Sequence, residues 1–321
     1  MPSRSIVDRL KAGEYIVMDG AMGSELQRRG VDVDKGCSVD KLGVWSAAAN
    51  LDAPDVVRAI HEDYLKVGAE IIISNNFFTS KGMLSMIGEQ NRWEEYVRRG
   101  GELAVAARDA VNPEAYVAGG IAPTFGYQNV NEDCGSDLGQ EFEAISRILA
   151  EAGVDFMLPE YMAGEIVHET PIKDCVTAVD ACAKTKLPVF LGLNIATDGK
   201  KDGKMMHGET YAELVAALKG HRVDGIFLMC CDPDEVTASL PELRKAFAGP
   251  IGAYAELGYY ENPKYGTSPD EKFWLHGIRG ITPEKYAEYA REWKKMGAQI
   301  IGGCCSSEPK HIKAIAPVVK G

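Results

Sequence analysis

Short apolar runs recur along the whole chain, and they alternate with segments in which apolar residues follow a helical spacing. Near-continuous apolar runs of this kind are typical of parallel strands that are buried on both faces. The pattern predicts eight strands, each followed by a helix. The strands are expected at residues 15–18, 70–74, 116–121, 155–158, 188–193, 225–229, 251–255 and 299–301.

Several of the predicted helices begin with a proline in the first turn, preceded by a side chain that can cap the helix. Proline is tolerated there because the first turn makes no use of its missing backbone N–H. Gly68 is expected to end the helix that starts near Pro54. The expected capping residues are Asp52, Asp232, Thr282 and Ser307.

Alternating strands and helices imply a parallel sheet with right-handed crossovers, and eight such units predict closure into a barrel. A doubly wound open sheet is disfavoured because no Gly-x-Gly-x-x-Gly pattern follows the first strand. We therefore expect an α/β fold, a (β/α)8 TIM barrel, as a single domain over residues 1–321. Long connections after the first, third and seventh strands indicate a site at the carboxyl ends of the strands.

Composition and charge argue against several classes of protein. The 321 residues carry 47 acidic and 35 basic side chains, a formal net charge of −12. This charge disfavours binding to nucleic acid or to an anionic membrane surface. No apolar run reaches the roughly 18 residues of a membrane-spanning helix, and the first residues lack the apolar core of a signal peptide. The expected location is the cytoplasm.

Four of the eight cysteines occur as two adjacent pairs, Cys230-Cys231 and Cys304-Cys305. Each pair directly follows a predicted strand, so both pairs are expected at the same mouth of the barrel. In a reducing compartment, clustered cysteines more often bind metal or take part in chemistry than form disulfides. Cys304, Cys305 and one member of the other pair would supply the three ligands of a catalytic zinc site with one open position.

Adjacent side chains of an extended strand point to opposite faces, so neighbouring cysteines reach one metal only where the backbone bends. Gly302 and Gly303 precede the second pair and a helix start follows it, which makes such a bend feasible. The competing interpretation is that the cysteines are small residues packed in the core. Two pairs on one rim favour the metal site.

Two acidic residues also follow predicted strands. Asp19 and Gly20 open a glycine-rich turn after the first strand, and Glu160 follows the fourth. The alternatives to a binding or acid–base role are a turn cap for Asp19 and a helix-start acid for Glu160. Aromatic side chains near the same rim would together form an apolar pocket that tolerates a cation. They are Trp45, Phe77, Phe78, Phe125, Tyr127, Tyr259, Tyr260 and Trp274.

The chain resembles the homocysteine S-methyltransferase family over nearly its whole length. The resemblance rests on the stretches MDGAMGSELQRRG, NNFFTS, DFMLPEY and IIGGCCSSEPKHIKAI, and the last of these is the most specific. The family implies a zinc ion held by Cys304, Cys305 and a cysteine after the sixth strand. Cys230 aligns best with that third ligand, but Met229 stands where the family has asparagine, so Cys231 remains a competing ligand.

The resemblance also implies the contacts with substrate. The amino-acid end of homocysteine is expected beside Asp19 and Glu160, which are the expected catalytic carboxylates. Phe77 and Phe78 match the aromatic pair of the family's second-strand loop. The full set of expected substrate-binding residues is Asp19, Gly20, Trp45, Phe77, Phe78 and Glu160.

The activity implied by this resemblance is the zinc-dependent transfer of a methyl group from a cationic donor to the thiol of homocysteine, giving methionine. S-methylmethionine and betaine both fit as donors, and the connection 256–281 is expected to distinguish them. The implied partners are homocysteine and a small methyl donor, with no nucleic acid and no membrane. A homo-oligomer is compatible with the sequence.

Three other functions compete with this one. Gly302 and Gly303 would cradle a phosphate in an aldolase or isomerase barrel, although no lysine at a strand end supports this. A zinc ion with Cys231 as a fourth ligand would be structural. The chain would also suit a stand-alone homocysteine-activating module of a folate or cobalamin methyl-transfer system.

Overall fold

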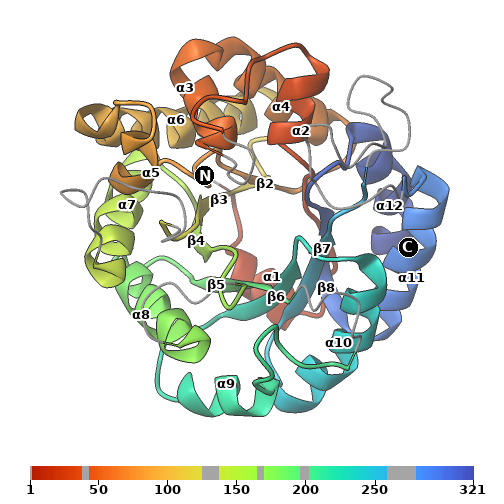
Figure 1. The fold of residues 1–321 in the computed structure, drawn as a ribbon. Helices are drawn as coiled ribbons and strands as arrows, with labels where there is room; N and C mark the ends of the chain where they lie inside the picture. Colours follow the sequence, from red (N-terminus) through yellow and green to blue (C-terminus); the bar gives the residue numbers. More distant parts are fainter. Residues whose placement is uncertain (1, 38–42, 125–136, 165–169, 196–201, 259–279) are drawn as a thin grey trace.

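Eight parallel strands form a ring at the centre of the molecule, as a computed structural model shows (Figure 1). The structure describes residues 2–37, 43–124, 137–164, 170–195, 202–258 and 280–321. The strands follow one another around the ring in chain order. They are β1 (Ile16–Val17), β2 (Ile71–Ile73), β3 (Tyr116–Ile121), β4 (Phe156–Pro159), β5 (Phe190–Asn194), β6 (Gly225–Met229), β7 (Ile251–Ala255) and β8 (Ala298–Gly303).

The strands pair in two groups that are joined at both seams. One sheet has the order β1-β8-β7-β6-β5 and the other has the order β2-β3-β4. A parallel bridge between Met18 and Ile71 joins β1 to β2, and one between Met157 and Val189 joins β4 to β5. The two bridges close the ring, so the predicted (β/α)8 barrel is confirmed.

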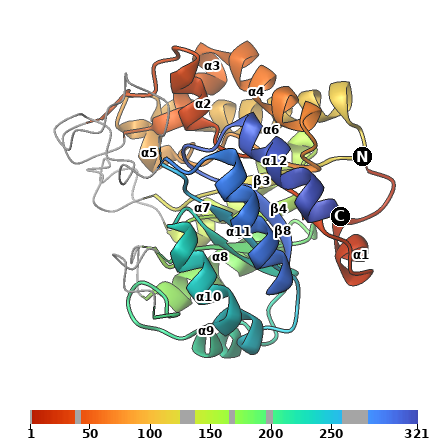
Figure 2. The same cartoon turned by 90° about the vertical axis from the view of Figure 1, so that its right-hand side faces the viewer.

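Helices surround this ring (Figure 1). The short helix α1 instead lies at one end of the barrel, where both chain termini are found (Figure 2). Its Ile6 and Leu10 pack into the barrel interior and fill that end. The helices are α1 (Ile6–Lys11), α2 (Gly23–Arg28), α3 (Ala49–Asp52), α4 (Pro54–Lys66), α5 (Lys81–Ser85), α6 (Trp93–Val111), α7 (Leu138–Ala152), α8 (Pro171–Ala183), α9 (Tyr211–Ala217), α10 (Pro233–Ala246), α11 (Pro283–Lys295) and α12 (Pro309–Lys320), with 3-10 turns η1 (Trp45–Ala48) and η2 (Gln90–Arg92).

Packed side chains fill the barrel interior along the described strands. Phe156 and Phe190 meet edge to face with ring centroids 5.0 Å apart, and Phe190 stacks on Phe227 at 5.2 Å. Phe227 in turn meets the ring of Tyr254 at 6.4 Å. Because α1 fills one end and these rings fill the middle, a ligand site has room only at the carboxyl ends of the strands.

The helix starts confirm two of the expected caps and overturn two. Thr282 caps α11, and Asp232 caps α10 in a capping box with Glu235. The expectation for Asp52 was wrong: it ends α3 and pairs with a lysine, while Ala53 precedes α4. Ser307 does not cap α12 either, because Glu308 occupies that position.

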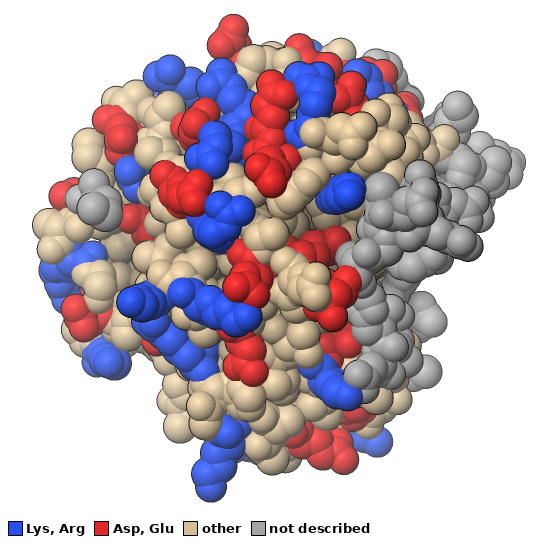
Figure 3. All heavy atoms as spheres, turned by 90° about the vertical axis from the view of Figure 1, so that its left-hand side faces the viewer, with Lys and Arg blue, Asp and Glu red and all other residues tan. Residues whose placement is uncertain are grey.

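Charges are mixed on the part of the surface that lies on the left in Figure 1. Figure 3 shows acidic and basic side chains interspersed there rather than gathered by sign. Such a face offers no extended positive area to a polyanion. Among the described residues, no helix combines the length and the apolar character needed to cross a bilayer.

Candidate functional site

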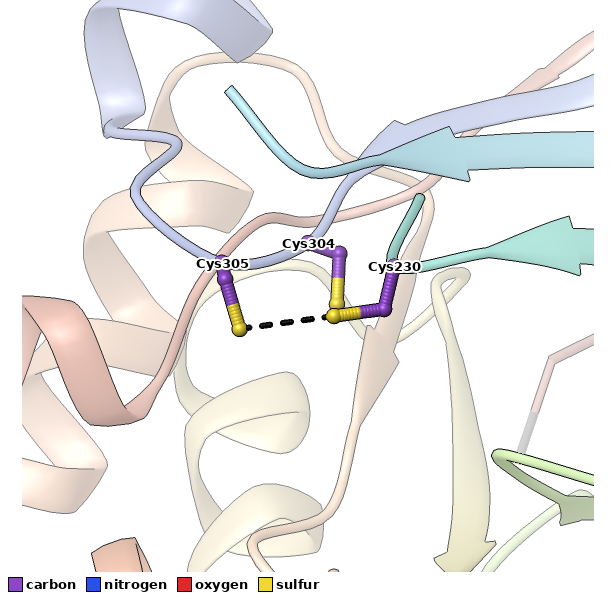
Figure 4. Close-up of side chains that lie close together, drawn as sticks. All are labelled: Cys230, Cys304 and Cys305. Atoms are coloured by element: carbon purple, nitrogen blue, oxygen red, sulfur yellow. Dashed lines mark hydrogen bonds between the residues drawn. The ribbon is translucent and has the colours of Figure 1, made fainter. Parts of the chain in front are cut away.

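Three cysteine sulfurs converge at the carboxyl ends of β6 and β8 (Figure 4). The Sγ atoms of Cys230, Cys304 and Cys305 all lie within 4.8 Å of one another, and those of Cys230 and Cys305 are 3.5 Å apart. β6 and β8 are both neighbours of β7 in the sheet. Residues 75 positions apart in sequence therefore meet through the order of the strands.

Cys230 reaches this group because its backbone leaves the strand conformation. Its φ is +48°, in the left-handed region that only a few non-glycine residues adopt. Met229 packs into the barrel interior, and the reversal at Cys230 lets the next side chain pack against the same interior cluster. Cys231 then points outward into the layer between strands and helices, where it is 2% exposed.

The three thiols share negative charge through hydrogen bonds. The Cys230 thiol donates to the sulfur of Cys305, and this bond together with one from Cys304 lowers the pKa of Cys305 to about 6. A separate hydrogen bond between Cys304 and Cys230, followed by the one between Cys304 and Cys305 and by burial, raises the pKa of Cys304 well above its usual range. One thiolate is thus stabilised by two thiol donors, an arrangement that a divalent cation would complete.

Two buried carboxylates lie at the same mouth. Glu160 follows β4, and its Oε1 accepts a hydrogen bond of 3.1 Å from the Tyr254 hydroxyl. Asp19 follows β1, and its Oδ2 accepts from the backbone N–H of Ile73 at 2.9 Å. The Oδ1 atom of Asp19 is buried and has no hydrogen-bond partner among the described residues.

Burial perturbs both carboxylates strongly. Desolvation is the main cause that raises the pKa of Glu160 to about 8, and the nearby Cys230 adds to it. Desolvation likewise raises the pKa of Asp19 above its usual range, with a further contribution from Glu160. A buried carboxylate with an unpaired oxygen, such as that of Asp19, is unfavourable alone, so it is suited to a bound ammonium group.

Glycines on the neighbouring strands make room for this arrangement. A Cβ atom on Gly120 would lie 2.5 Å from Oε2 of Glu160, and one on Gly192 would lie 2.7 Å from the Tyr254 hydroxyl oxygen. Real side-chain carbons do not approach other atoms so closely. The glycines in β3 and β5 therefore create the space in which Glu160 and Tyr254 meet.

The aromatic residues expected at the rim divide between two layers. Phe77 packs against the interior cluster that Cys230 and Cys304 also touch, and it meets the Tyr161 ring edge to face at 5.9 Å. Phe78 is 1% exposed and belongs to the outer layer. Trp45 is also buried in that layer, where its ring lies against Gly23 of α2. Five further aromatic candidates lie outside the described residues: Phe125, Tyr127, Tyr259, Tyr260 and Trp274.

Sequence reasoning did not single out Tyr254 or Glu256, and it noted Met229 only as a departure from the asparagine of the family. The Met229 sulfur accepts hydrogen bonds from the Tyr161 backbone N–H at 2.9 Å and from the Tyr254 hydroxyl at 3.3 Å. Glu256 directly follows β7, is largely buried, and has an Oε1 atom without a partner in the described chain. The signal for Glu256 was its place one residue after a strand, the same signal that identified Glu160.

The cysteine group has the composition and spacing of a metal site. Thiolates are soft ligands that select zinc, copper(I) or iron–sulfur clusters. At a zinc–sulfur distance of about 2.3 Å, tetrahedral ligands lie roughly 3.8 Å apart, close to the 3.5 Å between the sulfurs of Cys230 and Cys305. Three protein ligands leave one position open, as in catalytic zinc sites.

Sequence comparisons place the chain in one family. A family model described as homocysteine S-methyltransferase matches residues 16–319. S-methylmethionine–homocysteine S-methyltransferase BHMT2 of Pongo abelii is 28% identical over 98% of this chain and 80% of its own length. Betaine–homocysteine S-methyltransferase 1 of Rattus norvegicus is 28% identical over 98% of this chain and 74% of its own length.

A solved structure shows the same fold. The metallated form of the homocysteine methyltransferase MmuM from Escherichia coli matches with a TM-score of 0.70 and 22% identity. The match covers 97% of this chain and 98% of that one. The arrangement of strands and helices described above is therefore shared with a metal-containing protein over its whole length.

Proposed function

This chain belongs to the homocysteine S-methyltransferase family, and we propose that it uses a zinc ion held by Cys230, Cys304 and Cys305 to methylate homocysteine. The methyl group comes from a small cationic donor, and the product is methionine. The whole of residues 1–321 serves as one homocysteine-binding barrel domain. The observation that carries the proposal is the convergence of three sulfurs and two buried carboxylates at one barrel mouth.

The cysteine set suits activation of a substrate thiol. Zinc, when bound, lowers the pKa of a coordinating thiol so that the sulfur is deprotonated at neutral pH, whereas a free thiol has a pKa of about 8.5. Three cysteine thiolates bring more negative charge than a divalent cation balances. This excess keeps the sulfur of homocysteine electron-rich and therefore nucleophilic.

The carboxylates suit the other end of homocysteine. Oδ1 of Asp19 is an unpaired buried acceptor, and Glu160 has one oxygen engaged by Tyr254, so both can accept from an ammonium group. Tyr254 restricts the Glu160 side chain to one direction. Holding both ends of homocysteine presents its sulfur to the donor in one orientation, which lowers the entropic part of the barrier.

Aromatic side chains near the sulfurs suit a cationic donor. The faces of Phe77 and Tyr161 offer favourable contacts to a sulfonium or quaternary ammonium group. In the transfer step the homocysteine sulfur forms a bond to the methyl carbon, and the bond from that carbon to the donor atom breaks. Its electron pair stays on the donor, which leaves uncharged. Because charge is cancelled, a site that excludes water favours the transition state.

The geometry disfavours two of the competing functions. The backbone N–H of Gly303 donates to Asp19 and that of Cys304 donates to Ala255, so neither is free to cradle a phosphate. Cys231 packs outward into the layer between strands and helices, which argues against it as a fourth zinc ligand. S-methylmethionine ranks with betaine as a candidate donor, because both carry the methyl group on a cationic centre.

A panel of donors tests the proposal. Homocysteine is offered with S-methylmethionine, betaine, dimethylsulfoniopropionate or methyltetrahydrofolate, and methionine is measured. We expect methionine from a sulfonium or ammonium donor and none from the Cys304→Ala variant. Methionine formed only from methyltetrahydrofolate would support the stand-alone module instead. Undiminished transfer by Cys304→Ala protein would refute the zinc site.

X-ray absorption at the zinc edge is an independent check of the coordination. The proposal expects three sulfur ligands before homocysteine is added and four afterwards. Four sulfurs before addition, with no change afterwards, would indicate a structural zinc site that includes Cys231.

A further inference from the structure

We infer that segment 20–28 positions the zinc-binding turn. The positioning residues are Ser24 and Arg28 in that segment and Ser307 in the turn itself. The inference rests on the proposed zinc site. It concerns the four residues from Cys304 to Ser307, called here the Cys304–Ser307 turn. Segment 20–28 covers α2 and the residues before it, nearly three hundred positions away along the chain.

Ser307 joins the two segments through its hydroxyl group. Its Oγ accepts a hydrogen bond of 2.9 Å from the backbone N–H of Ala21 and donates one of 2.7 Å to the carbonyl oxygen of Cys304. The Tyr64 hydroxyl donates to the carbonyl oxygen of Ala21 at 2.9 Å and so ties the same contact to α4. One serine thus fixes a ligand residue to the first loop.

Ser306 is held through its backbone. Its φ of +66° is unfavourable for a residue with a side chain. Its N–H donates to Oγ of Ser24 at 3.0 Å, and its carbonyl oxygen accepts from Arg28 at 2.7 Å. An ion pair of 2.7 Å with Glu25 orients that arginine. The Oγ atom of Ser306 itself is buried without a partner in the described structure.

Two glycines allow this interlocking contact. A Cβ atom added to Gly20 or to Gly303 would overlap Oγ of Ser307. The glycine that follows Asp19 and the glycine that precedes Cys304 are therefore needed at the same point in space. The two most recognisable motifs of the sequence, DGAMG and GGCC, fit together around one hydroxyl group.

The consequence is that both ends of homocysteine meet a single hydrogen-bonded unit. Besides the contacts of Ser307, the N–H of Gly303 donates to the carbonyl oxygen of Asp19 at 2.8 Å. Asp19 is the proposed acceptor for the ammonium group, and Cys304 and Cys305 are proposed ligands of the zinc ion. The segment 20–28 therefore fixes the distance between the two parts of the site and aims both sulfurs at Cys230.

The test compares Ser307→Ala with Ser306→Ala in the full chain. The first removes the joining hydroxyl, and the second removes a hydroxyl of the same turn that makes no hydrogen bond in the described structure. The zinc dissociation constant is measured by competition with a chromophoric chelator. We expect Ser307→Ala to weaken zinc binding by about ten- to a hundredfold, and Ser306→Ala to leave it within about twofold of the original.

Cobalt(II) substitution gives a readout that does not depend on activity. Tetrahedral cobalt absorbs strongly in the visible region, so a Ser307→Ala site with misdirected sulfurs should show a weaker and shifted band. If Ser307→Ala does not fold, Ser24→Ala takes its place, because it removes only the acceptor for the Ser306 N–H. Equal zinc affinities and spectra for the folded variant and Ser306→Ala would overturn the inference. Failure of the unaltered protein to bind zinc would instead overturn the proposed function.

Discussion

The two turns that carry the cysteine sulfurs are held in different ways. Cys230 is held within the barrel wall, where its N–H donates to the carbonyl oxygen of Tyr254 at 3.0 Å. Asn194 Nδ2 donates to the carbonyl oxygen of Cys230 at 2.7 Å. Both partners belong to the adjacent strands β7 and β5. The Cys304–Ser307 turn is also bonded to β7, because the Cys304 N–H donates to the carbonyl oxygen of Ala255 at 2.8 Å. It is held in addition by the Ser24 and Arg28 side chains of segment 20–28.

The positions of the two turns are therefore determined by different parts of the molecule. A turn bonded to adjacent strands takes its position mainly from closure of the barrel. A turn bonded to a distant loop depends on particular side chains in that loop. Substitutions in the barrel wall should therefore disturb stability and zinc binding together. Substitutions in the contact between segment 20–28 and the Cys304–Ser307 turn should disturb zinc binding more than stability.

The largest expected effect comes from removing a sulfur from either turn. Cys230→Ala and Cys305→Ala should each lower zinc affinity by more than about a hundredfold, since loss of a ligand exceeds the loss of a partner of a ligand. The rate of methyl transfer should fall together with the zinc affinity. Bound zinc per chain is measured by elemental analysis after dialysis.

Cys231→Ala is the matched control for that prediction. It removes a thiol adjacent to Cys230 that packs into the outer layer, so about one zinc per chain should remain. Loss of zinc from Cys231→Ala with retention in Cys230→Ala would reverse the assignment of the third ligand.

Acid should destabilise α4, the helix whose Tyr64 is tied to segment 20–28. His61 lies in α4, one turn before Tyr64, and burial lowers its pKa from 6.5 to about 3. Below pH 6.5, His61 therefore binds a proton in the unfolded chain, whereas in the folded chain it stays neutral until the pH approaches 3. Stability is fully present above pH 6.5 and falls as the pH decreases toward 3. At pH 5 the loss is about 2 kcal/mol.

The His61→Leu variant isolates this contribution. Its free energy of unfolding, measured by urea titration, should fall less than that of the original chain between pH 7 and pH 5. The two chains are compared as differences between the two pH values, so any change in packing cancels. Equal losses in both proteins would show that another group titrates.

A smaller effect is expected where the barrel wall holds Cys230. Asn194→Ala removes the donor to the Cys230 carbonyl oxygen and should weaken zinc binding by about tenfold, the equivalent of one buried hydrogen bond. Asn50→Ala is the control, because Asn50 is also buried and donates to the carbonyl oxygens of Asn75 and Tyr96. Both variants should lose stability, but only Asn194→Ala should lose zinc affinity.

The smallest effect is expected at Ser306. Ser306→Gly removes an unfavourable positive φ and a buried hydroxyl without a partner in the described chain. The gain in the folded state is partly offset by the greater freedom of glycine in the unfolded chain, so the free energy of unfolding should rise by about 1 kcal/mol or less. A marked loss of stability would mean that the Ser306 hydroxyl has a role in the turn.

The strands were predictable because each is a nearly continuous apolar run. The bounds of β3, β6 and β7 equal the predicted ranges, and the shorter β1 (Ile16–Val17) lies inside its range. The caps were less predictable, because a capping side chain is short and finds other partners. Asp52 pairs with Lys35 at 2.6 Å, and the hydroxyl of Ser307 is engaged by Ala21 and Cys304.

The sequence by itself determined the barrel, the paired cysteines and their place at the strand ends, because periodicity and motif spacing are properties of the chain alone. Tertiary structure decided which sulfurs meet. The positive φ of Cys230 turns that side chain inward and Cys231 outward. It also decided that Ser24, Arg28 and Ser307 belong together. Hydrogen bonds between segments so far apart leave no periodic trace in the sequence, because they depend on the ring bringing β1 beside β8.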